Sequence, residues 1–101
     1  MDEHARMVLA MEVATGDTLD CDAPKRTERQ YWMRAVISAA LYAQGWTDDQ
    51  IGSQMHRNHA TIWCCRNRLA AALEMPRIYP DVVRMRNEFN ATYYELFGQR
   101  L

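Results

Sequence analysis

The sequence contains no long apolar run, no nucleotide-binding loop, no internal repeat and no low-complexity tract. No stretch of its 101 residues reaches the apolar length of a membrane-spanning helix. Charged residues interrupt the start of the chain, where a secretory signal would be apolar. The G-x-x-x-x-G-K-S/T loop that holds nucleotide phosphates is also missing, so we expect no nucleotide, no ATPase and no membrane contact. These absences predict a soluble cytoplasmic protein.

Cysteine is scarce and poorly spaced for cross-linking or metal binding. The three cysteines are an odd number, and Cys64 and Cys65 are adjacent, which suits neither an ordinary disulfide nor a zinc pair. Successive residues of a helix point about 100° apart, so this pair is badly placed to chelate one ion with His56 and His59. We therefore predict a reducing compartment, no metal and no cofactor.

Positive and negative charge are unevenly distributed along the chain. The formal net charge is −1 and the pI is about 6.3, which is not the basic balance of many nucleic-acid-binding proteins. Residues 1–24 carry one basic and six acidic side chains, whereas the chain from Lys25 onward carries 11 basic and seven acidic ones. Lys25, Arg26 and Arg29 lie close together. This asymmetry predicts a local positive face that would attract phosphates.

Hydrophobic periodicity favours helices throughout, and no segment alternates with the period of a strand. The composition, 49% hydrophobic and 25% charged, suits one globular domain over residues 1–101. We predict an all-α fold, a compact bundle of about five helices over residues 2–14, 28–44, 48–55, 59–74 and 81–97. The second helix is expected to bury Met33, Val36, Ile37, Ala40 and Leu41. The last helix is expected to bury Val82, Phe89, Tyr93, Leu96 and Phe97.

Residues 47–69 have the pattern of a helix-turn-helix. Thr47-Asp48-Asp49-Gln50 matches the S/T-x-x-E/Q capping box that starts a helix, and Asn58 is a suitable N-cap for the longer helix after the turn 55–57. In this motif the second helix enters the major groove of DNA by its N-terminal residues. The side chains predicted to face DNA are Asn58, His59, Ala60 and Thr61, followed by the outward positions Trp63, Cys64 and Arg66.

The same segment resembles a family signature. Ile51-Gly52 followed by Arg57-Asn58-His59-Ala60-Thr61-Ile62 is similar to the Ile-Gly, spacer, Arg-Asp-His-Ser/Thr-Thr-Val pattern of the C-terminal DNA-binding domain (domain IV) of the bacterial replication initiator DnaA. The order of helices and basic loop agrees over nearly all of the chain. The resemblance implies sequence-specific binding of double-stranded DNA, with a basic loop that sends an arginine into the minor groove. The DNA-binding residues are then Lys25, Arg26, Arg29, Thr47, Arg57, Asn58, His59, Ala60 and Thr61.

Several positions depart from that family pattern. Asn58 stands where the family has Asp, and Ala60 where it has Ser or Thr, which changes the hydrogen-bonding capacity at two base-facing positions. The turn 55–57 is one residue shorter than the common family form. Asp48 and Asp49 place carboxylates where the family approaches a phosphate. These departures predict a DNA target that differs from the family's A·T-rich box.

We expect a stand-alone regulator or replication-associated factor of a bacterium or phage, or else a fragment of a longer chain. It is expected to be associated with the nucleoid and to be a monomer. It is not expected to be an enzyme, because a small helical bundle seldom provides the cleft that catalysis needs. The alternative is a protein-interaction module that docks a partner through Phe89, Tyr93 and Phe97 and binds no DNA. Arg66 and Arg68 are expected on a solvated helix face.

Overall fold

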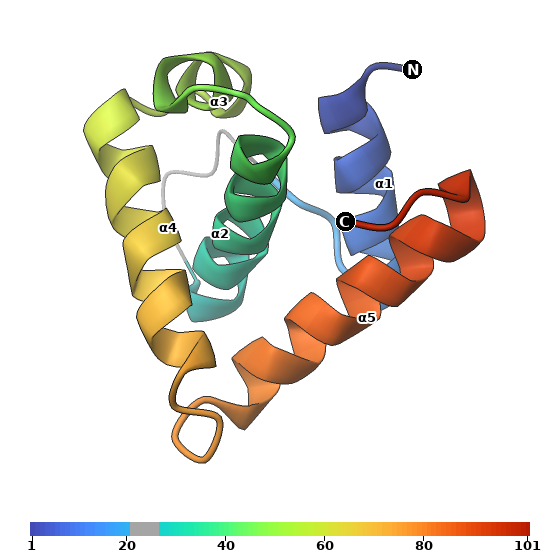
Figure 1. The fold of residues 1–101 in the computed structure, drawn as a ribbon, viewed down its shortest axis with the longest axis vertical. Helices are drawn as coiled ribbons and strands as arrows, with labels where there is room; N and C mark the ends of the chain where they lie inside the picture. Colours follow the sequence, from blue (N-terminus) through green and yellow to red (C-terminus); the bar gives the residue numbers. More distant parts are fainter. Residues whose placement is uncertain (21–26) are drawn as a thin grey trace.

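The computed structural model describes residues 1–20 and 27–101, and this part of the chain contains five helices (Figure 1). The helices are α1 (Glu3–Thr15), α2 (Glu28–Ala43), α3 (Asp48–Met55), α4 (His59–Leu73) and α5 (Pro80–Phe97). Since the described residues form no strand, the predicted all-α fold is confirmed. None of these helices is both long and apolar enough to cross a membrane. Lys25 and Arg26 of the predicted basic loop lie outside the described residues.

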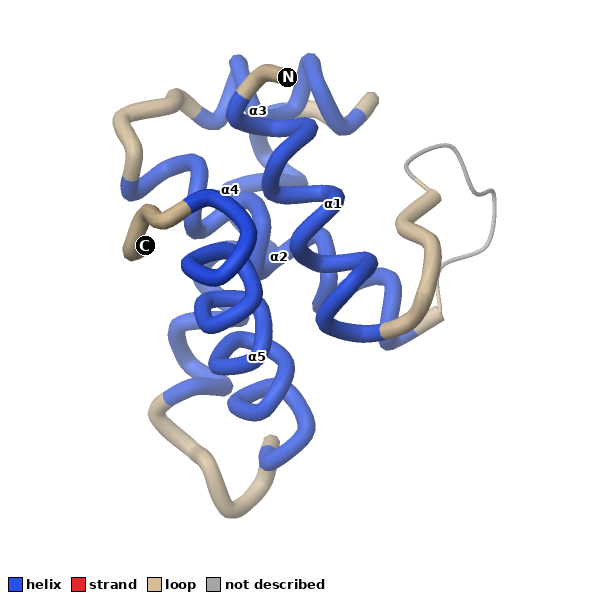
Figure 2. Tube along the Cα trace, turned by 90° about the vertical axis from the view of Figure 1, so that its right-hand side faces the viewer, coloured by secondary structure: helices blue, strands red, loops and turns tan. Residues whose placement is uncertain are grey.

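The helices pack largely in pairs. α1 packs mainly against α5, α2 packs mainly against α4, and α1 also touches α2. The short helix α3 packs against α4 and α2. Figures 1 and 2 place α3 at one end of the molecule and the loop between α4 and α5 at the opposite end. The predicted DNA-facing residues at the start of α4 therefore share one end of the molecule with α3.

The core is rich in methionine. Met7, Met11, Met33 and Met55 have no exposed surface, and they come from three different helices. An unbranched, flexible side chain fills the irregular gaps between helices that meet at different angles. Most of the predicted inner face of α2 is buried as expected, namely Met33, Val36, Ile37 and Leu41.

The predicted inner face of α5 is wrong at one position. Leu96 is 45% exposed, whereas Met85, which the prediction omitted, is buried. The face runs from Met85 through Phe89 and Tyr93 to the half-buried Phe97, whose ring centroid lies 5.0 Å from that of Tyr93. Steps of four residues continue this stripe at Phe97, and Leu96 lies about 100° away from it around the helix.

The aromatic face of α5 is used inside the molecule. Phe89 and Tyr93 are fully buried, and α5 packs along α1, whose Arg6 guanidinium lies 5.9 Å from the Phe97 ring centroid. Because Phe89 and Tyr93 are fully buried inside the fold, the expectation that they dock a partner is wrong for these two residues, whereas Phe97 is half-buried.

Candidate nucleic-acid interface

Helix α3 begins at the predicted capping box. The amide of Gln50 donates to Thr47 Oγ1 at 3.2 Å, and the amide of Thr47 donates to Gln50 Oε1 at 2.9 Å. Both free amides at the helix start are thus satisfied by local partners. The helix ends at His56, which adopts the left-handed conformation with φ 56° and ψ 42°. This reversal lets α4 begin after only three residues.

Gly52 permits the close return of the chain after α3. The amide of Arg57 donates to the Gly52 carbonyl at 2.9 Å, and a Cβ atom at position 52 would lie 2.3 Å from the Arg57 carbonyl oxygen. Only glycine fits at this position without moving backbone. The Arg57 guanidinium donates through Nη1 to the carbonyl of His56 at 3.0 Å, so it also covers the end of α3. Arg57 therefore has a structural role besides the predicted one.

The first turn of α4 presents the predicted base-facing residues to solvent. Asn58 Oδ1 accepts from the amide of Thr61 at 2.8 Å, which confirms Asn58 as the N-cap of this helix. The side chains of Asn58, His59 and Ala60 are exposed, and Thr61 is half-buried. The helix start therefore combines one amide, one imidazole and one methyl group within a single turn.

No acidic residue occurs between Arg57 and Leu73, so α4 is free of carboxylates along its whole length. On its outer side Trp63 is 55% exposed and Cys64 is exposed, whereas Cys65 points into the core. Burial raises the pKa of the Cys65 thiol, which leaves it protonated and unreactive.

Asp48, at the start of α3, is balanced by an arginine of α4. Arg66 donates from Nε and Nη2 to the two carboxylate oxygens of Asp48 at 2.8 and 2.9 Å, and its guanidinium carbon lies 3.7 Å from the centroid of the Tyr42 ring. These hydrogen bonds raise the pKa of Arg66. With only 16% of its side chain exposed, Arg66 does not lie on a solvated face, and that prediction is wrong. It joins α4 to α3 and removes the negative charge expected to repel phosphate there.

The other acidic residue at this end, Asp49, faces the start of α4. Its Oδ1 atom lies 3.4 Å from His59 Nδ1, and both side chains are largely exposed. His59 therefore has one weak internal partner that a phosphate or base could replace.

A hollow of about 380 Å³ lies beside the first turns of α4. Ala60, Cys64 and Arg68 follow one another at four-residue intervals along α4 and line one wall, together with Asn58, Thr61 and Tyr31 of α2. The Arg68 guanidinium carbon lies 5.2 Å from the Tyr31 ring centroid, and Arg68 is exposed as predicted. Burial raises the pKa of Tyr31, which keeps its phenol protonated at neutral pH. This hollow extends the candidate interface toward α2.

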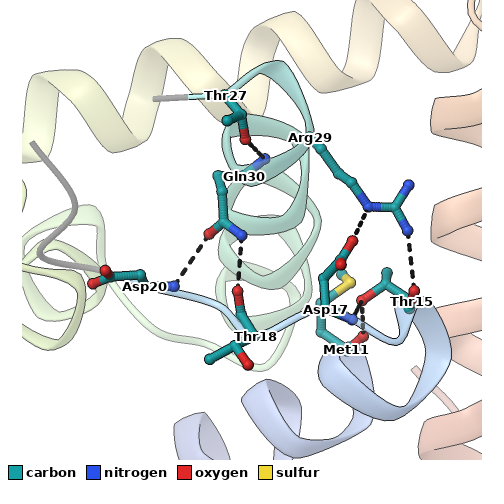
Figure 3. Close-up of polar contacts among 8 residues, drawn as sticks. All are labelled: Met11, Thr15, Asp17, Thr18, Asp20, Thr27, Arg29 and Gln30. Carbon is teal, nitrogen blue, oxygen red and sulfur yellow. Dashed lines mark hydrogen bonds and ion pairs between the residues drawn. The ribbon is translucent and has the colours of Figure 1, made fainter. Parts of the chain in front are cut away.

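Side chains at the start of α2, which follows residues 21–26, hold the segment that precedes those residues (Figure 3). Gln30 accepts from the amide of Asp20 at 3.1 Å and donates to the Thr18 carbonyl at 2.8 Å. Arg29 forms an ion pair with Asp17 and donates to the Thr15 carbonyl at 3.1 Å. Arg29, which was predicted to contact DNA, is thus bound to residues at and just after the end of α1.

A larger hollow of about 630 Å³ lies between the end of α1, the start of α2 and the start of α5. Its charged residues are mostly satisfied internally. Glu28 accepts from the Trp32 indole nitrogen at 3.4 Å, Arg84 lies 3.6 Å from Asp81, and Arg29 is paired as described above. Few polar groups are left there to orient a ligand, so this hollow is a weaker candidate site than the start of α4.

The sequence did not predict that Gln30 holds the segment before α2, or that Tyr31 and Arg68 line the hollow beside α4. The spacing of Ala60, Cys64 and Arg68 was a usable signal, because residues four apart share one side of a helix. Tyr31 and Gln30 gave no such signal, since their partners lie on other elements.

Searches against profiles of known protein families, curated proteins and solved structures find no match to this chain.

Proposed function

We propose that this protein binds double-stranded DNA sequence-specifically, with α4 in the major groove and α3 against the backbone. The observation that carries the proposal is the character of α4. This helix has no acidic residue, and its exposed first turn offers Asn58, His59 and Ala60. Amide and imidazole groups hydrogen-bond base edges, and a methyl group packs against thymine. The function is binding rather than catalysis.

The charge arrangement supports DNA over a protein partner. Asp48 is matched by Arg66, so the start of α3 carries less negative charge than its sequence suggests. Thr47 and Arg57 lie at the two ends of α3, where we assign them contacts with phosphates. The alternative, a protein-interaction module, is less well supported, because Phe89 and Tyr93 of its expected docking face are buried inside the fold.

The predicted basic loop completes the proposed interface. Gln30 and Arg29, which follow residues 21–26, hold the segment before those residues, and we assign Lys25 and Arg26 contacts with phosphates or the minor groove. The resemblance to domain IV of DnaA favours a nucleoid-associated regulator or replication factor. Asn58 and Ala60 favour a DNA site other than the box of that family.

Selection of bound duplexes from a random pool tests the proposal. The selected duplex and a scrambled one are then titrated by fluorescence anisotropy at several salt concentrations. We expect log affinity to fall linearly with log salt, with a slope of about −0.9 for each phosphate contacted. Failure to bind any duplex at low salt would refute the proposal.

Replacing His59 tests whether α4 contributes to sequence specificity or only to general DNA affinity. Asn58 is less suitable for this test, because it also caps α4 and replacing it would disturb the helix. The variant His59→Ala should lose about 1–3 kcal/mol on the selected duplex and much less on the scrambled one. Arg84→Ala, on the exposed surface of α5, is the matched control and should leave both affinities unchanged. Equal losses on both duplexes would show that α4 does not read the sequence.

A further inference from the structure

Trp63 is the exposed tryptophan of this fold. Trp32 is only 7% exposed, and Trp46 is half-buried, with its indole nitrogen donating to Glu3 at 2.7 Å. Trp63, in contrast, is 55% exposed and belongs to the outer side of α4 rather than to the core. An aromatic side chain with more than half of its surface in water contributes less to folding than a buried one, and tryptophan is enriched where proteins bind other molecules.

Trp63 lies on the same side of α4 as the proposed reading residues. It follows His59 by four residues and Ala60 by three, so the three side chains are neighbours on the helix surface. Cys64 follows Ala60 by four residues and is also exposed. A methyl group, an indole ring and a thiol therefore lie together on the exposed side of α4, ahead of the polar Asn67 and Arg68.

The floor of the major groove offers one apolar group, the 5-methyl group of thymine. We propose that Trp63, with Ala60, forms a contact surface for thymine methyl groups and is a specificity-determining residue of this protein. This inference rests on the proposed function. The occupant of the exposed side of α4 is DNA rather than protein, because the helix itself carries Arg68 and no carboxylate, which complements a polyanion. The nearby carboxylate of Asp49, on α3, faces His59.

Replacing thymine by deoxyuridine removes the methyl group and leaves base pairing unchanged. The full-length protein is titrated against the selected duplex and a set of duplexes in which each thymine is replaced singly by deoxyuridine. We expect affinity to fall about fourfold at one or more positions, the factor for burying one methyl group. The variant Trp63→Ala should bind thymine and deoxyuridine duplexes equally, whereas Tyr94→Ala, an exposed aromatic position on α5, should keep the full preference.

Acrylamide quenching of tryptophan fluorescence gives a second readout that needs no folded Trp63→Ala variant. Trp63 should supply most of the quenchable emission of the free protein, and the selected duplex should protect it. Trp63→Phe should remove that component and retain part of the preference for thymine. The inference is overturned if the selected site lacks thymine, if no deoxyuridine substitution lowers affinity, or if bound DNA leaves Trp63 quenchable. In each of these cases duplex binding itself persists, whereas failure to bind any duplex removes the proposed function as well.

Discussion

Replacement of Gly52 by alanine probes the contact that sets the distance between α3 and the start of α4. The added Cβ atom would lie 2.3 Å from the Arg57 carbonyl oxygen, 3.3 Å from the Arg57 carbonyl carbon and 3.4 Å from the carbonyl carbon of Asn58. All three are backbone atoms, so no side-chain rotation relieves the overlap. The chain at Arg57 must move away by roughly 1 Å or more to reach an ordinary contact.

The expected loss of stability combines three effects. Overpacking of this kind costs about 1–3 kcal/mol. The strained hydrogen bond from the Arg57 amide to the Gly52 carbonyl, 2.9 Å long in the native fold, costs up to about 1 kcal/mol more. Alanine offsets about 1 kcal/mol, because it favours the helix over glycine. We therefore expect Gly52→Ala to lower the free energy of unfolding by about 1–3 kcal/mol.

Urea unfolding followed by far-ultraviolet circular dichroism measures this change. Ser53→Ala is the matched control, because it adds the same residue at the next, exposed position of α3 and should shift stability by no more than about 0.5 kcal/mol. If Gly52→Ala is as stable as the unaltered protein, the close approach at Arg57 does not hold the connection between the two helices.

Four further substitutions test the surroundings of this connection. His56→Gly should raise the midpoint of urea unfolding, with a gain of about 0.5–1 kcal/mol, because a non-glycine residue is strained at φ 56°; a loss would mean that the imidazole contributes more than the strain costs. Arg66→Lys keeps the charge but loses the paired hydrogen bonds to Asp48, so it should cost about 0.5–1.5 kcal/mol in the same assay. A double-mutant cycle with Asp48→Asn that gives no coupling would contradict this. Burial lowers the pKa of His4, so the unfolded chain takes up that proton first as pH falls. The free energy of unfolding should therefore lose no contribution from His4 above a pH of about 6.5 and should fall as the pH drops below that value. His4→Gln should make the free energy of unfolding depend less on pH in this range, and an unchanged dependence would refute the prediction.

Capping residues and hydrophobic periodicity predicted the positions of the helices closely. The boundaries of α3 agree with the predicted residues 48–55, and Asn58 caps α4 as expected. Both features depend on hydrogen bonds between residues three positions apart, as in Thr47 with Gln50. Such bonds form within one turn of the chain, so residue type and spacing are enough to predict them.

The predictions for individual side chains at the candidate interface were wrong or incomplete where the partner residue lies far away in the sequence. Arg66 looked like a solvated arginine, but Asp48 lies 18 positions earlier and meets it only because α3 packs against α4. The same holds for Gln30, which reaches Asp20 and Thr18 across the turn after α1. No local pattern in a sequence encodes these pairs, because they depend on how the helices are placed relative to each other.

The sequence by itself determined the helical class, the limits of the helices and the acid-free character of α4, all of which follow from residue type and local spacing. Tertiary structure decided which faces of those helices remain in contact with solvent. It buried Phe89 in the core and left Trp63 exposed, although both are aromatic residues in amphipathic helices. The physical reason is that periodicity marks an apolar stripe on each helix, whereas burial requires a second helix to pack against that stripe.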